Sequence, residues 1–315
     1  MRNRPIVWTP DENEKTHVRT FMDLHGIADY DAFIKKSETD IKWFWEAFIQ
    51  FAGIQFSQPY EEIVDLTGGM VWPKWFTGGK INLVDNMLDK WAVNEETSER
   101  IAVMWEGEDG EARTYSYKQL YRETNRFANA LHQLGIGKGE RVAIFMPMIP
   151  ETVIALYGIY KAGAVAVPLF SGFGPEAIAL RLNDVEACAV VTADGFFRGG
   201  NKVLLKQTLD KALQSARTVR AVIVANRFGE NHCTMTDRDY KWSELVGGSS
   251  DAFETVQTDA EDMCMVSYSS GTTGKPKGIV HVHGGIAVKT AEAGLFVFDV
   301  KEDEIFYMIT DFGWM

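Results

Sequence analysis

Residues 141–170, RVAIFMPMIPETVIALYGIYKAGAVAVPLF, decide the fold class of this chain. Two short apolar runs, at residues 141–146 and 165–170, flank a longer run at residues 149–163 that is typical of a helix followed by a turn. Strands separated by a helix form βαβ units, and right-handed crossovers place such helices over the faces of a mostly parallel sheet. We therefore expect an α/β fold with helices on both faces of the sheet.

The same alternation continues toward the C-terminus. Helix-like runs occupy residues 175–186 and 201–213, and strand-like runs occupy residues 188–194, 221–226 and 263–268. Strands that are covered on both faces are buried, which explains why these runs are almost wholly apolar. We expect residues 263–268 to form the last strand before a polar loop.

A hairpin and a capped helix are predicted on the N-terminal side of this region. Asp109-Gly110 lies between two strand-like runs and is a strong turn signal for a β-hairpin. Ser116 followed by Gln119 fits a capping box, which opens a helix. The glycines of residues 135–139 (GIGKG) follow that helix and precede a strand. This is the wrong order for a dinucleotide-binding turn, so they predict a helix C-cap and turn.

Residues 1–92 are expected to form a helical wrapping segment outside the sheet. Residues 1–28 are polar and weakly patterned, which predicts a loosely held arm. Residues 29–56 have helical spacing, and residues 81–91 fit an amphipathic helix. Aromatic clusters usually cover a larger core. The cluster here comprises Phe33, Trp43, Phe44, Trp45, Phe48 and Phe51.

Composition excludes several classes of function. The 315 residues carry 32 basic and 44 acidic side chains, for a net charge of −12. This balance argues against a general nucleic-acid backbone binder but permits a local basic site for one phosphorylated ligand. No uncharged apolar segment reaches the roughly 18 residues of a membrane span, and no secretory signal is visible. We expect a cytoplasmic protein without nucleic-acid or membrane partners.

Neither the cysteines nor the histidines predict a metal site. Cys188, Cys233 and Cys264 are far apart and odd in number, unlike a disulfide or zinc framework. His281 and His283 would lie on one face of an extended strand but lack a third nearby ligand residue. We therefore assign no metal ligand within the chain.

Residues 268–278, YSSGTTGKPKG, are the strongest candidate for a binding site. Three glycines allow backbone amides to approach an anion, while hydroxyl groups and two lysines add donors and positive charge. The segment is not a Walker A loop, because Pro276 stands where that motif requires glycine and no Lys-Ser/Thr pair follows. A flexible surface linker would explain the glycines and serines but not the density of threonine and lysine. The segment therefore predicts a loop that binds a triphosphate.

Residues 269–278 resemble the signature of the adenylate-forming (AMP-binding) enzymes, which include acyl-CoA synthetases, luciferases and peptide-synthetase adenylation domains. The resemblance extends over roughly residues 40–315 and is similar to the acetyl-CoA synthetase branch. Further segments that carry it are KWFTGGKINLVDNMLDKWA (74–92), RTYSYKQLYRETNRFANAL (113–131), AGAVAVPLFSGFGPEAIALRLND (162–184), RGGNKVLLKQTLDKAL (198–213) and TDFGW (310–314).

This resemblance implies that residues 93–315 are the first part of the large AMP-binding (adenylation) domain. Members of the family join a carboxylic acid to ATP, release diphosphate, and pass the acyl group from the adenylate to coenzyme A. For this chain the implied function is that of a short-chain, acetyl-CoA-like synthetase acting on a small carboxylic acid. With Mg²⁺ assisting, the residues implied to hold the ATP phosphates are Ser269, Ser270, Gly271, Thr272, Thr273, Gly274, Lys275 and Lys277.

A second implied site holds the 3′-phospho-ADP part of coenzyme A. An arginine beside two glycines suits a phosphate, because a planar guanidinium and exposed amides converge. The residues implied are Phe170, Ser171, Gly172, Arg198, Gly199, Gly200 and Asn201. Two of them depart from the family pattern: Asn201 replaces the usual basic residue, and Ser171 stands where acetyl-CoA synthetases commonly have glycine. The structural alternative for residues 198–201 is a helix-entry loop.

The resemblance also implies that Trp314 and Met315 line the acyl pocket. Acetate-specific members tend to have a smaller valine or isoleucine at the second position, so a larger acid such as propionate or a branched acyl group would fit here. The family's ribose-binding aspartate and catalytic lysine follow the D-x-G-W element and do not occur in these residues. We therefore assign no catalytic residue and expect the chain to be an N-terminal portion that does not adenylate alone. The alternatives are a non-catalytic nucleotide-binding or interaction fragment, and an adenylate-forming enzyme that does not use coenzyme A.

Overall fold

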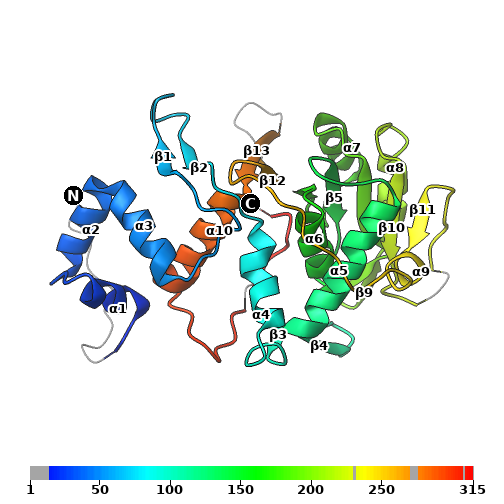
Figure 1. The fold of residues 1–315 in the computed structure, drawn as a ribbon. Helices are drawn as coiled ribbons and strands as arrows, with labels where there is room; N and C mark the ends of the chain where they lie inside the picture. Colours follow the sequence, from blue (N-terminus) through cyan, green and yellow to red (C-terminus); the bar gives the residue numbers. More distant parts are fainter. Residues whose placement is uncertain (1–13, 230–231, 270–275, 308, 315) are drawn as a thin grey trace.

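A seven-stranded sheet organises the computed structural model, which describes residues 14–229, 232–269, 276–307 and 309–314 (Figure 1). Neighbouring strands of the sheet are parallel except for the last pair, which is antiparallel. The mostly parallel sheet expected from the sequence is therefore confirmed. In spatial order its strands are β11 (Asp239–Lys241), β10 (Ala221–Ala225), β7 (Ala189–Ala193), β5 (Arg141–Phe145), β6 (Val165–Pro168), β12 (Met263–Ser269) and β13 (Lys277–Val282).

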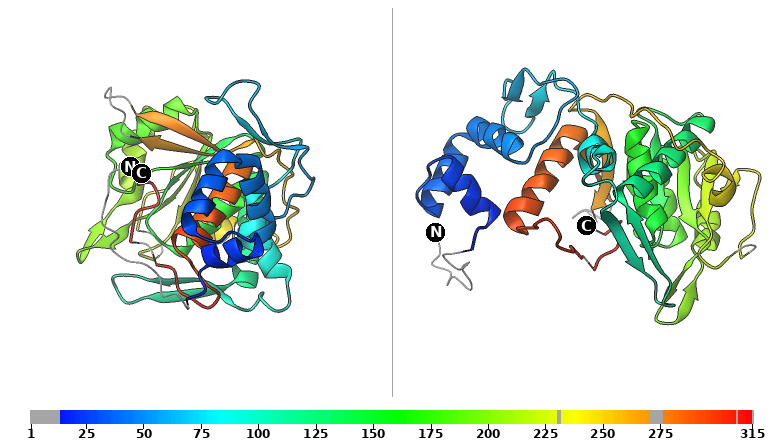
Figure 2. Two further views of the ribbon diagram at one scale, coloured as in Figure 1. Left: turned by 90° about the vertical axis from the view of Figure 1, so that its left-hand side faces the viewer. Right: turned by 60° about the horizontal axis from the view of Figure 1, so that its bottom comes forward.

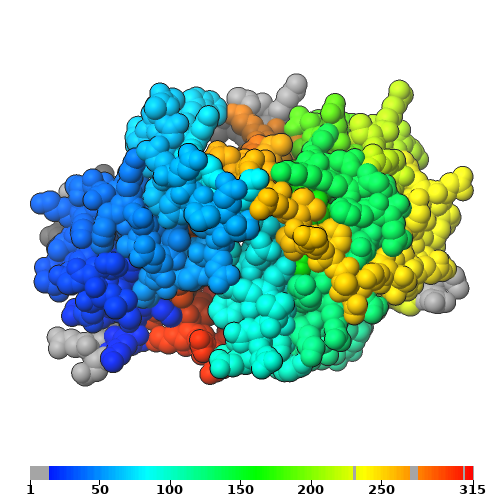
Figure 3. All heavy atoms as spheres, in the orientation of Figure 1, coloured from blue at the N-terminus to red at the C-terminus, as the bar shows by residue number. Residues whose placement is uncertain are grey.

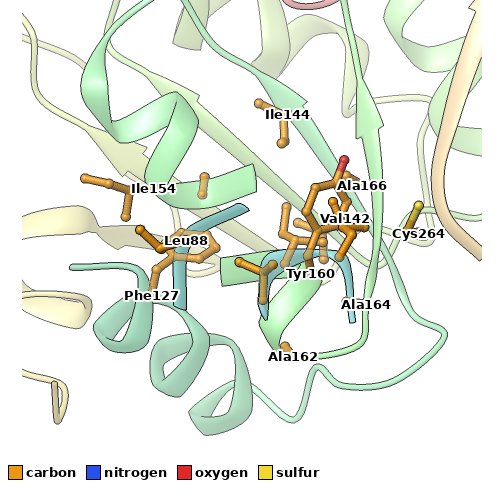
Figure 4. Close-up of a cluster of buried hydrophobic side chains, with 14 of the residues drawn as sticks. Leu88, Phe127, Val142, Ile144, Ile154, Tyr160, Ala162, Ala164, Ala166 and Cys264 are labelled. Carbon is orange, nitrogen blue, oxygen red and sulfur yellow. The ribbon is translucent and has the colours of Figure 1, made fainter. Parts of the chain in front are cut away.

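Helices cover both faces of this sheet, as expected. The four main ones are α5 (Tyr117–Gln133) and α6 (Pro150–Lys161) on one face, with α7 (Pro175–Asp184) and α8 (Leu205–Ala212) on the other. Successive residues of β5 point to opposite faces. Val142 and Ile144 join Phe127 of α5 in one buried cluster (Figure 4), whereas Phe145 joins the second cluster. Burial on both faces explains why the central strands β5, β6, β7 and β10 are almost wholly apolar.

The local predictions around α5 are confirmed. Two strands, β3 (Ile101–Glu106) and β4 (Ala112–Ser116), form the expected hairpin, with Gly110 at a positive φ in its turn. Ser116 Oγ accepts a hydrogen bond from the Gln119 amide, and the Gln119 side chain accepts one from the Ser116 amide. At the other end of α5, Gly135 has φ +65° and the Ile136 amide donates to Leu131, as in a helix C-cap.

The N-terminal part contains the helices expected over residues 29–56. Its elements are α1 (His17–Leu24), α2 (Tyr30–Thr39), α3 (Ile41–Phe51), β1 (Glu62–Asp65) and β2 (Lys74–Thr77). The three helices lie beside a late helical segment, α10 (His283–Glu292) followed by the π-helix η2 (Ala293–Val297) (Figure 2). Phe33 and Phe48 are buried, as predicted for the aromatic cluster.

The prediction of a loosely held arm over residues 1–28 is wrong for the described part of that range. Thr16 caps α1 by accepting a hydrogen bond from the Arg19 amide. Phe21 is fully buried, and its ring centroid lies 5.3 Å from that of Phe296 in η2. The local sequence is polar and did not predict this helix, because the residues that bury Phe21 come from a distant part of the chain. Residues 1–13 lie outside the described residues.

Residues 81–93 join the N-terminal part to the sheet. The helix predicted there is present as the π-helix η1 (Asp85–Asp89), which continues into α4 (Lys90–Val93). The buried Lys161 Nζ donates to both carboxylate oxygens of Asp89, at 2.9 and 2.8 Å. Thr255 Oγ1 donates to the same carboxylate at 2.9 Å. A buried ion pair therefore holds η1 against α6.

Two short elements remain: the hairpin of β8 (Phe196–Arg198) and β9 (Asn201–Val203), and the helix α9 (Trp242–Leu245). The segment after α9 crosses the surface between α5 and the N-terminal part (Figure 3). Asn125 and Asn129 of α5 donate to the backbone carbonyls of Asp251 and Ser250, which fixes this crossing. No helix in the described part of the chain is both long and apolar enough to cross a bilayer.

Candidate functional site

The sheet brings the predicted binding loops to one edge. Because β5, β6, β7 and β12 run parallel, the loops that follow them emerge where open α/β sheets bind their ligands. Met265 of β12 is paired with Ala166 of β6, which places Ser269 about level with Phe170. The phosphate loop and residues 170–174 therefore begin at the same level of neighbouring strands.

The β12–β13 pairing holds both ends of the phosphate loop. Ser269 is paired with Lys277, and Tyr268 with Gly278, so the first and last predicted phosphate ligands are adjacent. Lys277 is exposed. Phosphate binding by this loop stays a prediction, because six of its residues lie outside the described part of the chain: Ser270, Gly271, Thr272, Thr273, Gly274 and Lys275.

Residues 198–201 form the turn of a small hairpin, not a helix-entry loop. β8 (Phe196–Arg198) pairs with β9 (Asn201–Val203), and the helix-like run predicted from residue 201 begins only at Leu205. Gly199 and Gly200 have φ values of 57° and 76°, in the left-handed region. Successive amides in turns of this kind form an anion-binding concavity. It already holds a carboxylate, because Glu108 Oε1 accepts from Gly199 N at 2.9 Å and Oε2 accepts from Gly200 N at 3.2 Å.

Asp311 links the implied coenzyme A loop to the TDFGW segment. Ser171 Oγ donates to Asp311 Oδ2 at 2.5 Å, and Gly313 N donates to Asp311 Oδ1 at 2.8 Å. A Cβ on Gly313 would lie 2.1 Å from Phe170 N, so only glycine permits this approach. The Phe170 ring centroid lies 5.2 Å from that of Trp314. The implied coenzyme A loop and the implied acyl-pocket residue Trp314 are therefore in contact.

A cavity of about 510 Å³ lies where these loops meet. Its wall includes Ser171, Asp311 and Arg198, together with Arg227, which follows β10. Within the described residues, Arg198 has no carboxylate partner within 4 Å and is exposed. A larger cavity of about 700 Å³, between Trp91 and residues 300–306, contains none of the predicted site residues. We place the candidate site in the smaller cavity because the predicted groups converge there.

Of the remaining predicted residues, Asn201 and Gly172 make structural contacts, and Trp314 and Met315 are the last two residues of the sequence. Asn201 Nδ2 donates to Gly199 O at 3.2 Å, which braces the turn of the hairpin. A Cβ on Gly172 would lie 2.5 Å from the Phe170 ring. Trp314 is 65% exposed, and Met315 lies outside the described residues. The role of Trp314 and Met315 in an acyl pocket therefore stays a prediction.

Arg181 of α7 contacts residues of two predicted binding segments, and the sequence did not single it out. Its buried guanidinium lies 4.1 Å from the Phe173 ring centroid and 5.4 Å from that of Tyr268. Nη1 donates to Ala177 O, whereas Nε has no partner among the described residues. Burial lowers the pKa of Arg181. The pKa of Tyr268 is raised, first by burial and then by the Asp184 carboxylate, which accepts a hydrogen bond from the Tyr268 hydroxyl. Arg181 thus ties the loop after β6 to the residue that precedes the phosphate loop.

Two family models match successive parts of this chain. Residues 88–315 match the AMP-binding enzyme family, and residues 30–87 match the acetyl-coenzyme A synthetase N-terminus. The chain is 36% identical over 304 residues to an acetyl-coenzyme A synthetase of Pyrobaculum aerophilum, a match that covers 92% of this chain and 44% of the relative. It is 42% identical over 243 residues to that of Streptomyces coelicolor, covering 77% of this chain and 37% of the relative.

A solved structure shares the fold. Acetoacetyl-CoA synthetase from Streptomyces lividans superposes with a TM-score of 0.89 at 27% identity, covering 98% of this chain and 48% of that one. The chain thus spans less than half the length of these relatives. It belongs to the AMP-binding enzyme family and corresponds to the N-terminal portion of its acyl-CoA synthetases.

Proposed function

We propose that this chain is the N-terminal portion of a short-chain acyl-CoA synthetase. The whole enzyme would convert ATP, a small carboxylic acid and coenzyme A into acyl-CoA, AMP and diphosphate through an acyl-adenylate. The observation that carries this proposal is the convergence of Arg198, Ser171 and Asp311 on one cavity, at the sheet edge where Ser269 opens the phosphate loop. This arrangement brings Arg198, a cation without a carboxylate partner among the described residues, close to the sheet edge where the phosphate loop begins.

The proposed chemistry has two displacement steps. A carboxylate oxygen of the acid attacks the α-phosphate of ATP, and diphosphate leaves. The sulfur of coenzyme A then attacks the acyl carbon, and AMP leaves. Negative charge builds on the departing diphosphate, and fixed amides, hydroxyl groups and lysines near it would stabilise that charge. We assign this role to residues 269–278, of which Lys277 is exposed at the start of β13.

Mg²⁺ is proposed to enter with the triphosphate. Residues 14–229, 232–269, 276–307 and 309–314 contain no group of three or more His, Cys, Asp or Glu side chains suited to a metal ion. Mg²⁺ is commonly held by substrate phosphates with only one or two protein carboxylates. The hydroxyl-rich composition of residues 269–278 fits such shared binding. When bound, the ion would neutralise charge on the phosphates.

Arg198 is assigned to a phosphate of coenzyme A. Arg198 lines the cavity without a carboxylate partner among the described residues, so its guanidinium can donate two parallel hydrogen bonds to a phosphate. We further propose a cytoplasmic location, since Cys188, Cys233 and Cys264 are free thiols, as is usual in a reducing compartment. Small molecules alone are proposed as partners.

The test is ATP–diphosphate exchange with acetate, propionate and isobutyrate. It is run on the chain alone and on a hybrid that continues into the C-terminal portion of the Streptomyces coelicolor relative. We expect exchange from the hybrid only. Exchange by the chain alone would show that its own residues suffice for adenylation. A folded hybrid that binds MgATP without exchange would contradict the ligase proposal and favour a non-catalytic nucleotide-binding fragment.

A matched pair of variants tests the coenzyme A assignment in the same hybrid. Arg198→Ala should raise KM for coenzyme A about tenfold and leave diphosphate exchange unchanged. Arg217→Ala, an exposed arginine after α8, should change neither quantity. Exchange in a hybrid whose product formation never depends on coenzyme A would favour an adenylate-forming enzyme of another kind.

A further inference from the structure

The anion-binding concavity of the β8–β9 turn is filled by a side chain of the same molecule. Glu108, 91 residues away in the turn between β3 and β4, places one carboxylate oxygen on each of the amides of Gly199 and Gly200. The distances are 2.9 and 3.2 Å. A carboxylate seated on two successive amides uses the same donors that a phosphate would use. The concavity is thus a working anion site whose present occupant is Glu108.

Separate contacts hold the β3–β4 turn in this position. The Arg227 side chain is 6% exposed, with Nη2 2.5 Å from Asp109 Oδ1 and Nη1 3.0 Å from Glu111 Oε2. A Cβ on Gly107 would lie 2.5 Å from Arg227 Nη2, so the turn approaches Arg227 as closely as glycine allows. Asp194 Oδ1 in turn accepts a hydrogen bond from the Arg227 backbone amide at 2.7 Å. Glu108 is therefore presented by a braced turn and not by a free loop.

A phosphate approaching Gly199 and Gly200 meets both an occupied pair of donors and a negative charge. Like charges a few ångströms apart repel, and because Glu108, Gly199 and Gly200 are exposed, this repulsion adds to the loss of the two donors without replacing it as the main effect. Arg198 lines the same cavity and has no carboxylate partner among the described residues, so it remains free for a phosphate. The cavity thus offers a phosphate the Arg198 side chain, whereas Glu108 occupies the amides of Gly199 and Gly200.

We propose that Glu108 is a specificity-determining residue of the coenzyme A site. Its carboxylate occupies the two amides that would otherwise donate hydrogen bonds to a terminal phosphate. The 3′-phosphate of coenzyme A therefore adds little to the binding free energy. The proposal rests on the proposed function, which makes coenzyme A the ligand of this cavity. It predicts that the chain binds coenzyme A and dephospho-coenzyme A with affinities within about threefold of each other.

The experiment titrates the 315-residue chain with coenzyme A and with dephospho-coenzyme A by calorimetry. Glu108→Ala frees both amides, and Glu108→Gln removes only the charge. Glu106→Ala is the matched control, because Glu106 lines the same cavity and carries the same charge without bonding the glycine amides. We expect Glu108→Ala to bind coenzyme A about tenfold more tightly than the wild type, with dephospho-coenzyme A unchanged. Glu108→Gln should lie between, and Glu106→Ala should match the wild type.

The proposal is overturned if the wild type already prefers coenzyme A tenfold, or if Glu108→Ala leaves the ratio of the two affinities unchanged. If no variant binds either ligand, coenzyme A is not held by the cavity of this chain alone, and inorganic phosphate decides the role of Glu108 separately from the proposed function. Inorganic phosphate is titrated into each protein, and binding is followed by NMR through the amide resonances of Gly199 and Gly200. Saturable shifts in Glu108→Ala but not in the wild type support the proposal, and equal behaviour of the two proteins overturns it.

Discussion

Ser171 and Asp311 join two distant loops through one short hydrogen bond, with the Ser171 hydroxyl 2.5 Å from Asp311 Oδ2. Asp311→Ala removes the acceptor for both Ser171 Oγ and Gly313 N, so we expect the free energy of unfolding to fall by about 1–3 kcal/mol. Ser171→Ala should cost about 1 kcal/mol. Urea unfolding of both variants and of the double variant measures the coupling. Costs that add within about 0.3–0.5 kcal/mol would show that the two side chains do not interact.

Lys161 and Asp89 provide a test of a buried ion pair. Lys161→Met leaves the Asp89 carboxylate with Thr255 as a donor but without its cation, so we expect a loss of about 3–5 kcal/mol in unfolding free energy. The double variant Lys161→Met/Asp89→Leu should recover more than half of that loss. Lys118→Met breaks an exposed pair with Glu99 and should cost about 1 kcal/mol or less. Equal losses at Lys161 and Lys118 would contradict the assigned role of burial.

His283 should make the chain less stable in acid. Burial lowers its pKa to about 4, while Asp262 opposes that shift and Lys138 adds to it. Leu83 N donates to His283 Nδ1 at 3.2 Å, which favours the neutral ring. The unfolded histidine takes up a proton near pH 6.5, so its contribution is complete above that pH and is lost as the pH falls toward 4, by up to about 3 kcal/mol.

The measurement for His283 is urea unfolding at a series of pH values. His283→Asn keeps an acceptor but cannot titrate, so its unfolding free energy should depend less on pH between about 6.5 and 4. His132→Asn changes an exposed histidine and should retain the wild-type slope. Identical slopes for His283→Asn and the wild type would rule out His283 as the source.

Gly158 should be intolerant of alanine even though it lies within a helix. Alanine is the better helix former by about 1 kcal/mol, which alone would stabilise α6. However, a Cβ at this position would lie 2.6 Å from the Phe127 ring of α5 and 3.1 Å from the Thr124 carbonyl. We expect a net loss of about 1–3 kcal/mol from overpacking. Gly137→Ala has open space and should be neutral, so a thermal melt of the two variants separates packing from propensity.

Lys277 should contribute to nucleotide affinity. Lys277→Ala removes an exposed ammonium at the end of the phosphate loop, and we expect MgATP to bind about tenfold more weakly in calorimetry. Lys211→Ala, an exposed lysine on α8, is the control for the change in net charge. Unchanged affinity in a folded Lys277→Ala variant would count against phosphate binding by this loop.

Local signals predicted the sheet and its helices well. Apolar strands buried on two faces, the Ser116 cap and the Asp109-Gly110 turn each depend on neighbouring residues, so short windows of sequence contain the physical cause. The structure differed where distant residues act. Phe21 is buried by Phe296, and α1 therefore escaped a reading of local pattern.

The candidate site shows the same division. The glycines of the β8–β9 turn and the loop after β6 could be picked out by motif, because their backbone requirements restrict the sequence. Glu108 and Arg227 could not, since a charged residue in a hairpin turn or a loop ordinarily faces solvent. Arg181 left a faint signal, as the one cation within an apolar helix face. Its stacking on Phe173 and Tyr268 required the tertiary structure.

The position of Phe296 has a consequence for synthesis on the ribosome. Its ring packs against Phe21 and Phe48, with centroid distances of 5.3 and 5.1 Å, so α1 and α3 share their core with η2, which comes far later in the sequence. Helices α1–α3 leave the ribosome before η2 and lack this partner until η2 has been translated. Exposed apolar surface of this kind makes growing chains prone to aggregation. We expect the nascent chain to expose this apolar surface to chaperones until residue 297 has left the ribosome.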